Sequence, residues 1–409
     1  MDRQDTVSIW APASRMWPAV SAGLCATLVG IGLARFAYTP LLPAVVGAHW
    51  FGASAAAYIG AANLAGYLAG ALVAHPMLKF SSAASLIRMM MLLASAAFIA
   101  CAFPVSFAWF FTWRLASGFA GGVLMVLAAP TVLSHVAPSR RGLAGGIIFT
   151  GVGVGIAASG TLVPLLLDRG LKQAWMGLGV LALVLTVVAW RGWPTAPPPT
   201  LPIRTRAPRR ALPLWILYIE YGLNAVGLVP HMLFLVDFVA RGLGQGVQAG
   251  AHYWVLFGAG AIVGPLLTGQ LADRIGPRSA LLIAYALQAF AVGLPALYLG
   301  TVSLAFSSLV MGAFTPGIVI LVLGRVHELV PHDHGSQKVA WSVATTSFAV
   351  MQALAAFGLS FVFQNSGGSY RLLFLIAVCA LALAFMIESG VGTFTSARRA
   401  ESRDGPTRG

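Results

Sequence analysis

The 409-residue chain is 58% hydrophobic and only 9% charged, whereas a soluble domain has about 25% charged residues. This deficit excludes an exterior that faces only water, so lipid must surround much of the chain. The net charge of +14 does not indicate nucleic-acid binding, because the basic residues are spread over short segments rather than gathered on one soluble domain. The apolar runs are long and lack period-2 alternation, which predicts membrane-spanning helices rather than barrel strands.

About twelve runs are long enough to cross a bilayer, since one helical span needs about 20 apolar residues. The predicted spans are 17–42, 53–74, 82–103, 106–129, 142–166 and 173–190, followed by 212–236, 250–272, 279–299, 302–324, 339–363 and 371–390. Most of the 25 Lys and Arg residues then fall on one side of the membrane. This bias predicts a multi-pass protein of the cell (inner) membrane with both termini in the cytoplasm.

A segment rich in Arg and Pro, residues 191–211, interrupts the series of spans and predicts a cytoplasmic linker. The linker separates an N-terminal six-helix half (1–190) from a C-terminal six-helix half (212–390), which a cytoplasmic tail (391–409) follows. Short segments of the two halves run parallel, as do those beginning at Gly66 and Gly264. A duplicated unit would place the transport path between the repeats, although chance similarity of Gly/Ala/Leu-rich helices is the alternative.

The loop after the eighth predicted span carries the sharpest motif, G-Q-L-A-D-R-I-G-P-R, in which the defining residues are Gly269, Asp273, Arg274, Gly276 and Arg278. It resembles the loop signature G-x-x-x-D-R-x-G-x-[RK] of the major facilitator superfamily. The glycines permit a tight turn and close approach of helices. Asp273 is expected to pair with a neighbouring helix end or Arg and so to act as a gate. The first half has Ala74 and His75 in place of the Asp-Arg pair.

Further segments support this resemblance. The fourth span contains R-L-A-S-G from Arg114, similar to the superfamily's R-x-x-x-G motif, and the fifth is rich in glycine from Gly146 to Gly160. The segment Gly30–Pro43 resembles the first helix of the YbfB/YjiJ-type subgroup. The resemblance implies an all-α membrane fold of two six-helix halves and a secondary transporter, without indicating a substrate.

Three charged residues, Arg35, Arg114 and Glu220, lie deep in the predicted spans. Each costs about 2.5–3.5 kcal/mol there even on the mildest scale, so each should face protein or water. They fall on spans 1, 4 and 7, which the resemblance implies line a central cavity. The arginines are candidates to attract an anionic group, and Glu220 is a candidate for proton exchange. The alternatives are a structural pair or carbonyl cap for each Arg and a permanent salt bridge for Glu220.

Helical spacing groups further polar and aromatic residues with these charges. In the seventh span Glu220, Asn224 and His231 share one face, which suggests a face in contact with water. In the first span Arg35 and Tyr38 share a face. The predicted substrate path comprises Arg35, Tyr38, Asn63, Tyr67, Arg114, Glu220, Asn224, His231, Trp341 and Gln352.

A run at His327, Glu328 and His332 imitates a zinc-protease site but has the wrong spacing, and Pro331 interrupts the helix. It is interpreted as a solvated loop, so no metal is expected. The chain also lacks a nucleotide-binding G-x-x-x-x-G-K-[ST] motif, and no cofactor is expected.

The sequence therefore predicts a transporter rather than an enzyme. It would move a small organic solute, anionic or amphiphilic, by alternating access with proton coupling, and it would act as a monomer in the lipid bilayer. A polytopic membrane enzyme would need convergent acid, base or metal groups at one level, and none is evident. A non-transporting sensor would typically carry a long soluble extension.

Overall fold

The computed structural model describes residues 13–194, 212–330 and 334–403, and within these ranges its regular structure is entirely helical. Most of the predicted linker therefore lies outside the described residues. Among the residues that the structure describes, twelve helical segments are long and apolar enough to cross a membrane, which confirms the predicted all-α class with twelve spans. They are Met16–Gly47, Ala53–Met77, Ala83–Cys101, Phe107–Leu133, Arg141–Leu167, Leu171–Ala189, Leu212–Gly242, Gly246–Ile275, Pro277–Leu297, Thr301–Leu329, Gly335–Asn365 and Tyr370–Gly390.

The chain forms two compact units. Unit 1 is Met1–Pro202 with Val236–Ile262, and unit 2 is Ile203–Leu235 with Val263–Gly409. The division differs from the predicted halves, because the end of the seventh span and the first part of the eighth belong to unit 1.

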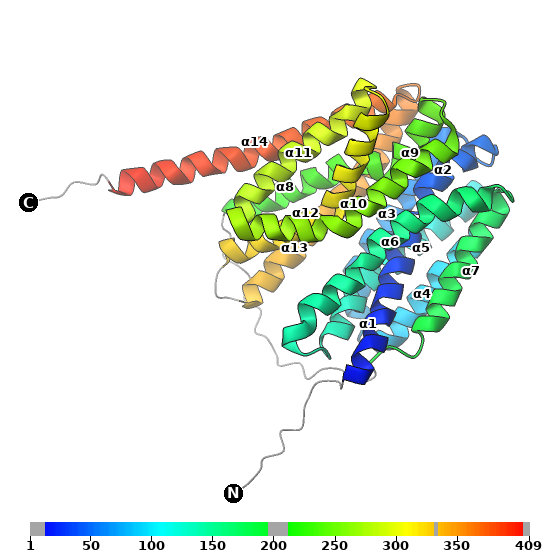
Figure 1. Ribbon diagram of the computed structural model, residues 1–409, viewed down its shortest axis with the longest axis horizontal. Helices are drawn as coiled ribbons and strands as arrows, with labels where there is room; N and C mark the ends of the chain where they lie inside the picture. The colour runs from blue at the N-terminus through cyan, green and yellow to red at the C-terminus, as the bar shows by residue number, and fades with distance from the viewer. Residues whose placement is uncertain (1–12, 195–211, 331–333, 404–409) are drawn as a thin grey trace, which may run out of the picture. The chain divides into compact units, whose positions relative to one another are not determined.

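Unit 1 contains the first six spans. Its helices, seen in Figure 1, are α1 (Ala13–Thr27), α2 (Tyr38–Gly47), α3 (Ala53–Met77), α4 (Ala83–Cys101), α5 (Phe107–Leu133), α6 (Arg141–Leu167) and α7 (Leu171–Ala189). A π-helical segment, η1 (Leu28–Leu33), follows α1, and a 3₁₀ turn, η2 (Pro138–Arg140), precedes α6.

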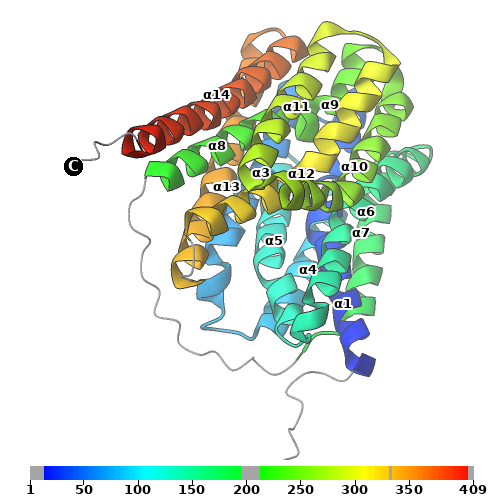
Figure 2. The same ribbon diagram turned by 60° about the vertical axis from the view of Figure 1, so that its left-hand side comes forward.

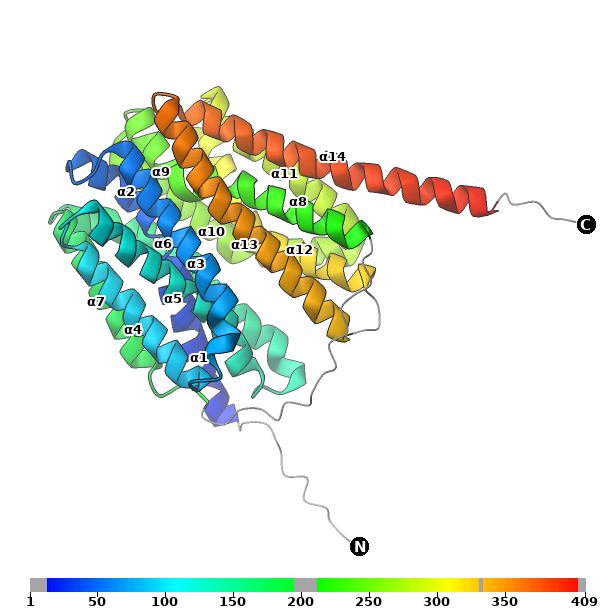
Figure 3. The same cartoon turned by 180° about the vertical axis from the view of Figure 1, so that it is seen from behind.

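Helices α3 and α5 of unit 1 approach each other backbone to backbone, because glycines line their contact (Figure 3). A Cβ placed on Gly118 would lie 1.9 Å from the Asn63 carbonyl oxygen, and one on Gly66 would lie 2.0 Å from that of Leu115. Only a residue without a side chain fits at such positions. The glycine of the R-x-x-x-G motif is thus a packing residue.

The first span is not a continuous α-helix. After η1, residues 34–37 form a turn before α2 begins. Pro40 has no N–H for the Phe36 carbonyl, which instead accepts a hydrogen bond from the Thr39 amide at 3.2 Å. Arg35 therefore lies in a turn between η1 and α2 rather than within a regular α-helix.

Unit 2 contains the C-terminal spans, and its helices are α8 (Leu212–Val229), α11 (Pro277–Leu297), α12 (Thr301–Leu329), α13 (His334–Asn365) and α14 (Tyr370–Arg403). Two π-helical segments, η3 (Pro230–Phe234) and η4 (Phe238–Gly242), flank the short α9 (Leu235–Asp237) in the seventh span, and α10 (Gly246–Ile275) runs from unit 1 into unit 2.

Within unit 2, α8 lies along α14 and α13, and α11 lies along α12 and α14 (Figure 2). Helix α14 continues beyond Gly390 to Arg403, and so extends past the other helices of this unit (Figures 1 and 3). We call the end at which α8 and α11 begin and α12 ends the linker side of unit 2.

Candidate functional site

Arg114 of α5 is 2% exposed and reaches the broken first span of unit 1. Its Nη1 donates to the Ala34 carbonyl at 2.8 Å, and its guanidinium lies 4.7 Å from the centre of the Tyr38 ring. The same carbonyl accepts from Asn63 Nδ2 and Ser117 Oγ, each at 3.3 Å. Tertiary hydrogen bonds of this kind satisfy backbone groups at a helix break in a membrane.

No carboxylate accompanies this guanidinium in the part of unit 1 that the structure describes. The ion pairs there do not include Arg114, and its Nε has no hydrogen-bond partner. A buried cation is costly without a compensating charge. Arg114 therefore acts as a carbonyl cap and still carries a positive charge that an anion would stabilise.

Arg35 lies next to aromatic rings in unit 1 and is partly exposed. Its guanidinium is 4.7 Å from the centre of the Tyr67 ring and 5.2 Å from that of Phe36. Such cation–π contacts are favourable where water is partly excluded. The structure thus brings Arg35 and Tyr67 together, and it brings Arg114 together with Tyr38 and Asn63.

The polar residues of the seventh span that were expected to contact water are buried against protein. Asn224 Nδ2 donates to Gln288 Oε1 of α11 at 2.9 Å, and His231 Nε2 hydrogen-bonds with Ser307 Oγ of α12 at 2.8 Å. Because Ser307 donates its hydrogen to the Ala291 carbonyl, it must accept from His231. Asn224 and His231 are each 0% exposed.

We expect substitution of Asn224 by alanine to lower stability more than solute affinity. The change leaves the buried Gln288 oxygen without its donor, which costs about 1–3 kcal/mol. Thermal unfolding of the purified protein and the KM for uptake would measure the two effects. A raised KM with unchanged stability would instead place Asn224 in the substrate path.

Gln352 and Trp341 lie on α13, which packs against another side of α8. The Gln352 amide contacts the Met232 sulfur at 3.5 Å, and this glutamine is 1% exposed. Trp341 is partly exposed. Of the two predicted path residues on α13, Trp341 is the one that remains accessible.

Glu220 on α8 is 0% exposed and lies against a second carboxyl group, that of Glu388 on α14, within hydrogen-bonding reach. No N–H or hydroxyl group of the described residues donates to either oxygen of Glu220. The permanent salt bridge considered for Glu220 is therefore absent among the residues that the structure describes.

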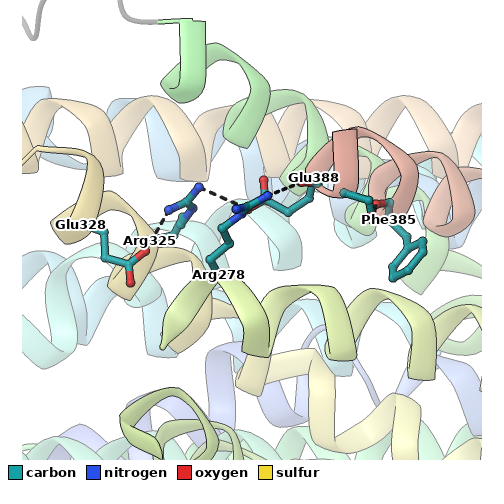
Figure 4. A network of polar contacts seen from close by, with 6 residues as sticks. Arg278, Arg325, Glu328, Phe385 and Glu388 are labelled. Atoms are coloured by element: carbon teal, nitrogen blue, oxygen red, sulfur yellow. Dashed lines mark hydrogen bonds and ion pairs between the residues drawn. The ribbon is translucent and has the colours of Figure 1, made fainter. Parts of the chain in front are cut away.

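The gating motif forms the junction between α10 and α11 on the linker side of unit 2. Gly276 has a φ of +84°, a conformation that favours glycine. Arg278 Nε donates to Glu388 Oε1 at 3.0 Å, and Arg278 Nη2 donates to the Glu388 carbonyl at 2.9 Å (Figure 4). Arg325 of α12 pairs with Glu388 at 3.2 Å and with Glu328 at 2.9 Å.

Of the two partners expected for Asp273, a neighbouring helix end or an Arg, the structure shows no pairing with an Arg among the described residues. Asp273 and Arg274 are exposed, and no ion pair among the described residues contains either of them. The acidic partner of the motif is Glu388 instead. Of the run that imitates a zinc site, Glu328 pairs with Arg325, while His332 lies outside the described residues.

Sequence reasoning missed two buried acids. Glu388 is 2% exposed, and Asp237 is 0% exposed and pairs with Arg241 one turn further along the seventh span. Asp237 lies just beyond the predicted span 212–236, and Glu388 lies near the end of the predicted span 371–390. Charged residues are common at such positions, so neither was singled out as an intramembrane charge. A pairing signal was present for Asp237, since Arg241 follows at i+4.

Comparison with known proteins agrees with this architecture. Two crystal structures of a bacterial homologue of the human lysosomal transporter Spinster, inward-facing and either unoccupied or occupied, each give a TM-score of 0.72. They are 16% and 17% identical to the chain, cover 93% and 95% of it, and are themselves covered to 98%. A mutant of the nucleoside transporter NupG gives a TM-score of 0.70 at 15% identity, covering 92% of this chain and 99% of its own.

These identities are low, so the structural likeness shows the fold alone. No curated protein sequence matches the chain. A family model described as "Uncharacterised MFS-type transporter YbfB" matches residues 27–389, which is most of the chain. The chain therefore belongs to the YbfB-type family of major facilitator superfamily transporters and is a multi-pass membrane protein.

Proposed function

We propose that the protein is a secondary active transporter of the cytoplasmic (inner) membrane that moves a small organic anion by alternating access, coupled to protons. Its family and its twelve candidate spans support the transport role. The positive-inside bias supports an orientation with both termini in the cytoplasm. The protein would act as a monomer.

The charge of the solute is proposed from one observation, the buried guanidinium of Arg114. Its described partners are a carbonyl and a ring face, and its Nε is left over. A carboxylate or phosphate group of a solute would supply the missing negative charge in a fixed, forked geometry. The rings beside Arg35 favour a solute that also has an apolar part.

The solute class is testable on the purified protein by thermal shift. Compounds that bind the folded state raise its apparent stability, by about 2.7 kcal/mol at a concentration 100 times Kd. The panel would pair organic anions with neutral and cationic compounds of the same apolar skeleton. We expect stabilisation by anions, and a response confined to cations or neutral compounds would contradict the proposal.

Proton coupling is assigned to Glu220, because a buried carboxyl group without a donor or cation of its own favours its protonated form. We expect Glu220→Gln to abolish the stimulation of uptake by a pH gradient in proteoliposomes, while solute binding persists. The exposed Asp168 offers a matched control, and Asp168→Asn should retain the stimulation. Undiminished stimulation in Glu220→Gln would exclude this role for Glu220.

A further inference from the structure

Unit 2 contains a carboxyl pair whose two members have very different surroundings. Glu388 accepts from Arg278 of α11 and pairs with Arg325 of α12. Glu220 lies against Glu388 but has no N–H or hydroxyl donor among the described residues. Two carboxyl groups in hydrogen-bonding reach attract each other only when one of them carries a proton.

The charges around this pair balance without Glu220. The network in Figure 4 joins two cations, Arg278 and Arg325, to two anions, Glu328 and Glu388. An ionised Glu220 would add an uncompensated negative charge at a position that is 0% exposed. Such a charge is costly, so Glu220 is most easily kept buried with a proton on it.

The charged groups on the helices that pack on α8 around Glu220 are consistent with a protonated Glu220. Helix α14 supplies Glu388, α12 supplies Arg325, and α11 supplies Arg278 together with the buried Tyr285. The side chains of α13 that meet α8, Ser347, Phe348 and Met351, are uncharged. Glu388 is thus the acidic group against which Glu220 packs.

We propose that Glu220 and Glu388 form a proton-binding site in which one proton is shared between the two carboxyl groups. With the proton present, Glu220 donates to Glu388 and ties α8 to α14, while Glu388 keeps its ion pairs. When the proton leaves to water, two adjacent carboxylates repel each other and compete for Arg278 and Arg325. Loss of the proton therefore loosens the ion pairs on the linker side of unit 2. This inference rests on the proposed role of Glu220 and adds Glu388 and the two arginines to it.

The test is a pH titration, by infrared difference spectroscopy, of the carbonyl band of protonated carboxyl groups in the purified full-length protein. The band assigned to the pair should be present in the wild type and absent from Glu220→Gln. Glu388→Gln leaves two cations beside Glu220, so the band should survive only to lower pH, by about one unit or more. Arg278→Gln removes a cation, so the band should survive to higher pH. Asp273→Asn, which changes an exposed carboxyl group on the same side of unit 2, should titrate as the wild type does.

The opposite directions of the two shifts are diagnostic of a shared site. Arg278→Gln also keeps the test decisive should Glu388→Gln fail to fold. Wild-type titration in either variant that folds would overturn the proposal. The infrared readout does not depend on transport. Failure of the shared carboxyl site can therefore be distinguished from failure of the proposed coupling role of Glu220. Loss of gradient stimulation in Glu220→Gln with no shift in Glu388→Gln would reject the pair alone, whereas both shifts with normal gradient stimulation would reject the coupling role alone.

Discussion

Replacing Arg114 with glutamine is expected to lower solute uptake by roughly 30-fold or more, because removing one partner of a buried charge pair costs about 2–5 kcal/mol. Glutamine is two bonds shorter than the donating Nη1 of arginine, so the variant removes the charge together with one of the side-chain hydrogen bonds to the Ala34 carbonyl. Asn63 and Ser117 still donate to that carbonyl. Uptake in proteoliposomes, normalised to the amount of inserted protein, would measure the loss.

Two companion variants separate charge from capping. Arg114→Lys keeps the positive charge but lacks the planar guanidinium that donates two parallel hydrogen bonds, so it should retain part of the uptake. Ser117→Ala removes a different donor to the same carbonyl and leaves the charge untouched, so uptake should stay within about twofold of the wild type while stability falls by about 1 kcal/mol. Normal uptake in Arg114→Gln, accompanied by a lower melting temperature, would show that Arg114 serves only as a cap.

Replacing Gly118 with leucine is expected to prevent unit 1 from folding. Even its Cβ would lie 1.9 Å from the carbonyl oxygen of Asn63, and this oxygen belongs to the backbone of α3, which cannot turn aside. Overpacking in a well-packed core costs about 1–3 kcal/mol when side chains can adjust, and here α3 and α5 would have to separate. We expect loss of the monodisperse protein on size exclusion after extraction in detergent.

A glycine in the same unit provides the control for this change. Gly146 of α6 is helical, and a Cβ added to it would have no atom within 4 Å. Gly146→Ala should leave yield and melting temperature unchanged or slightly raised, because alanine favours a helix over glycine by about 1 kcal/mol. A well-folded Gly118→Leu protein would contradict the close packing of α3 on α5.

The spans could be predicted from sequence because hydrophobic length is a property of each segment alone. The departures from α-helix in the first and seventh spans were harder to predict from the sequence, although Pro40 and Pro230 lie at them. A proline shows that a helical hydrogen bond is lost, but not which neighbour compensates for it. Pro40 accounts for the Phe36 carbonyl, but the Ala34 carbonyl two residues earlier is satisfied from α3 and α5, and no local pattern contains that information.

Residues of the candidate site were recognised more reliably than their surroundings. Periodicity placed Glu220, Asn224 and His231 on one face, yet it could not tell whether that face meets water or other helices. The structure shows Gln288, Ser307 and Glu388 there. The partner of the gating motif was missed for the same reason, since Arg278 and Glu388 are 110 residues apart in the chain.

The balance of charges on the linker side of unit 2 also has an electrical consequence. Arg278, Arg325, Glu328 and Glu388 sum to zero, so displacing them together through the membrane field does no net work. A proton carried across the field does, at about 2.3 kcal/mol per 100 mV. Joint displacement of the ion-pair network therefore adds nothing to the voltage dependence of transport, which must come from other charges such as the proton, the solute or the uncompensated Arg114.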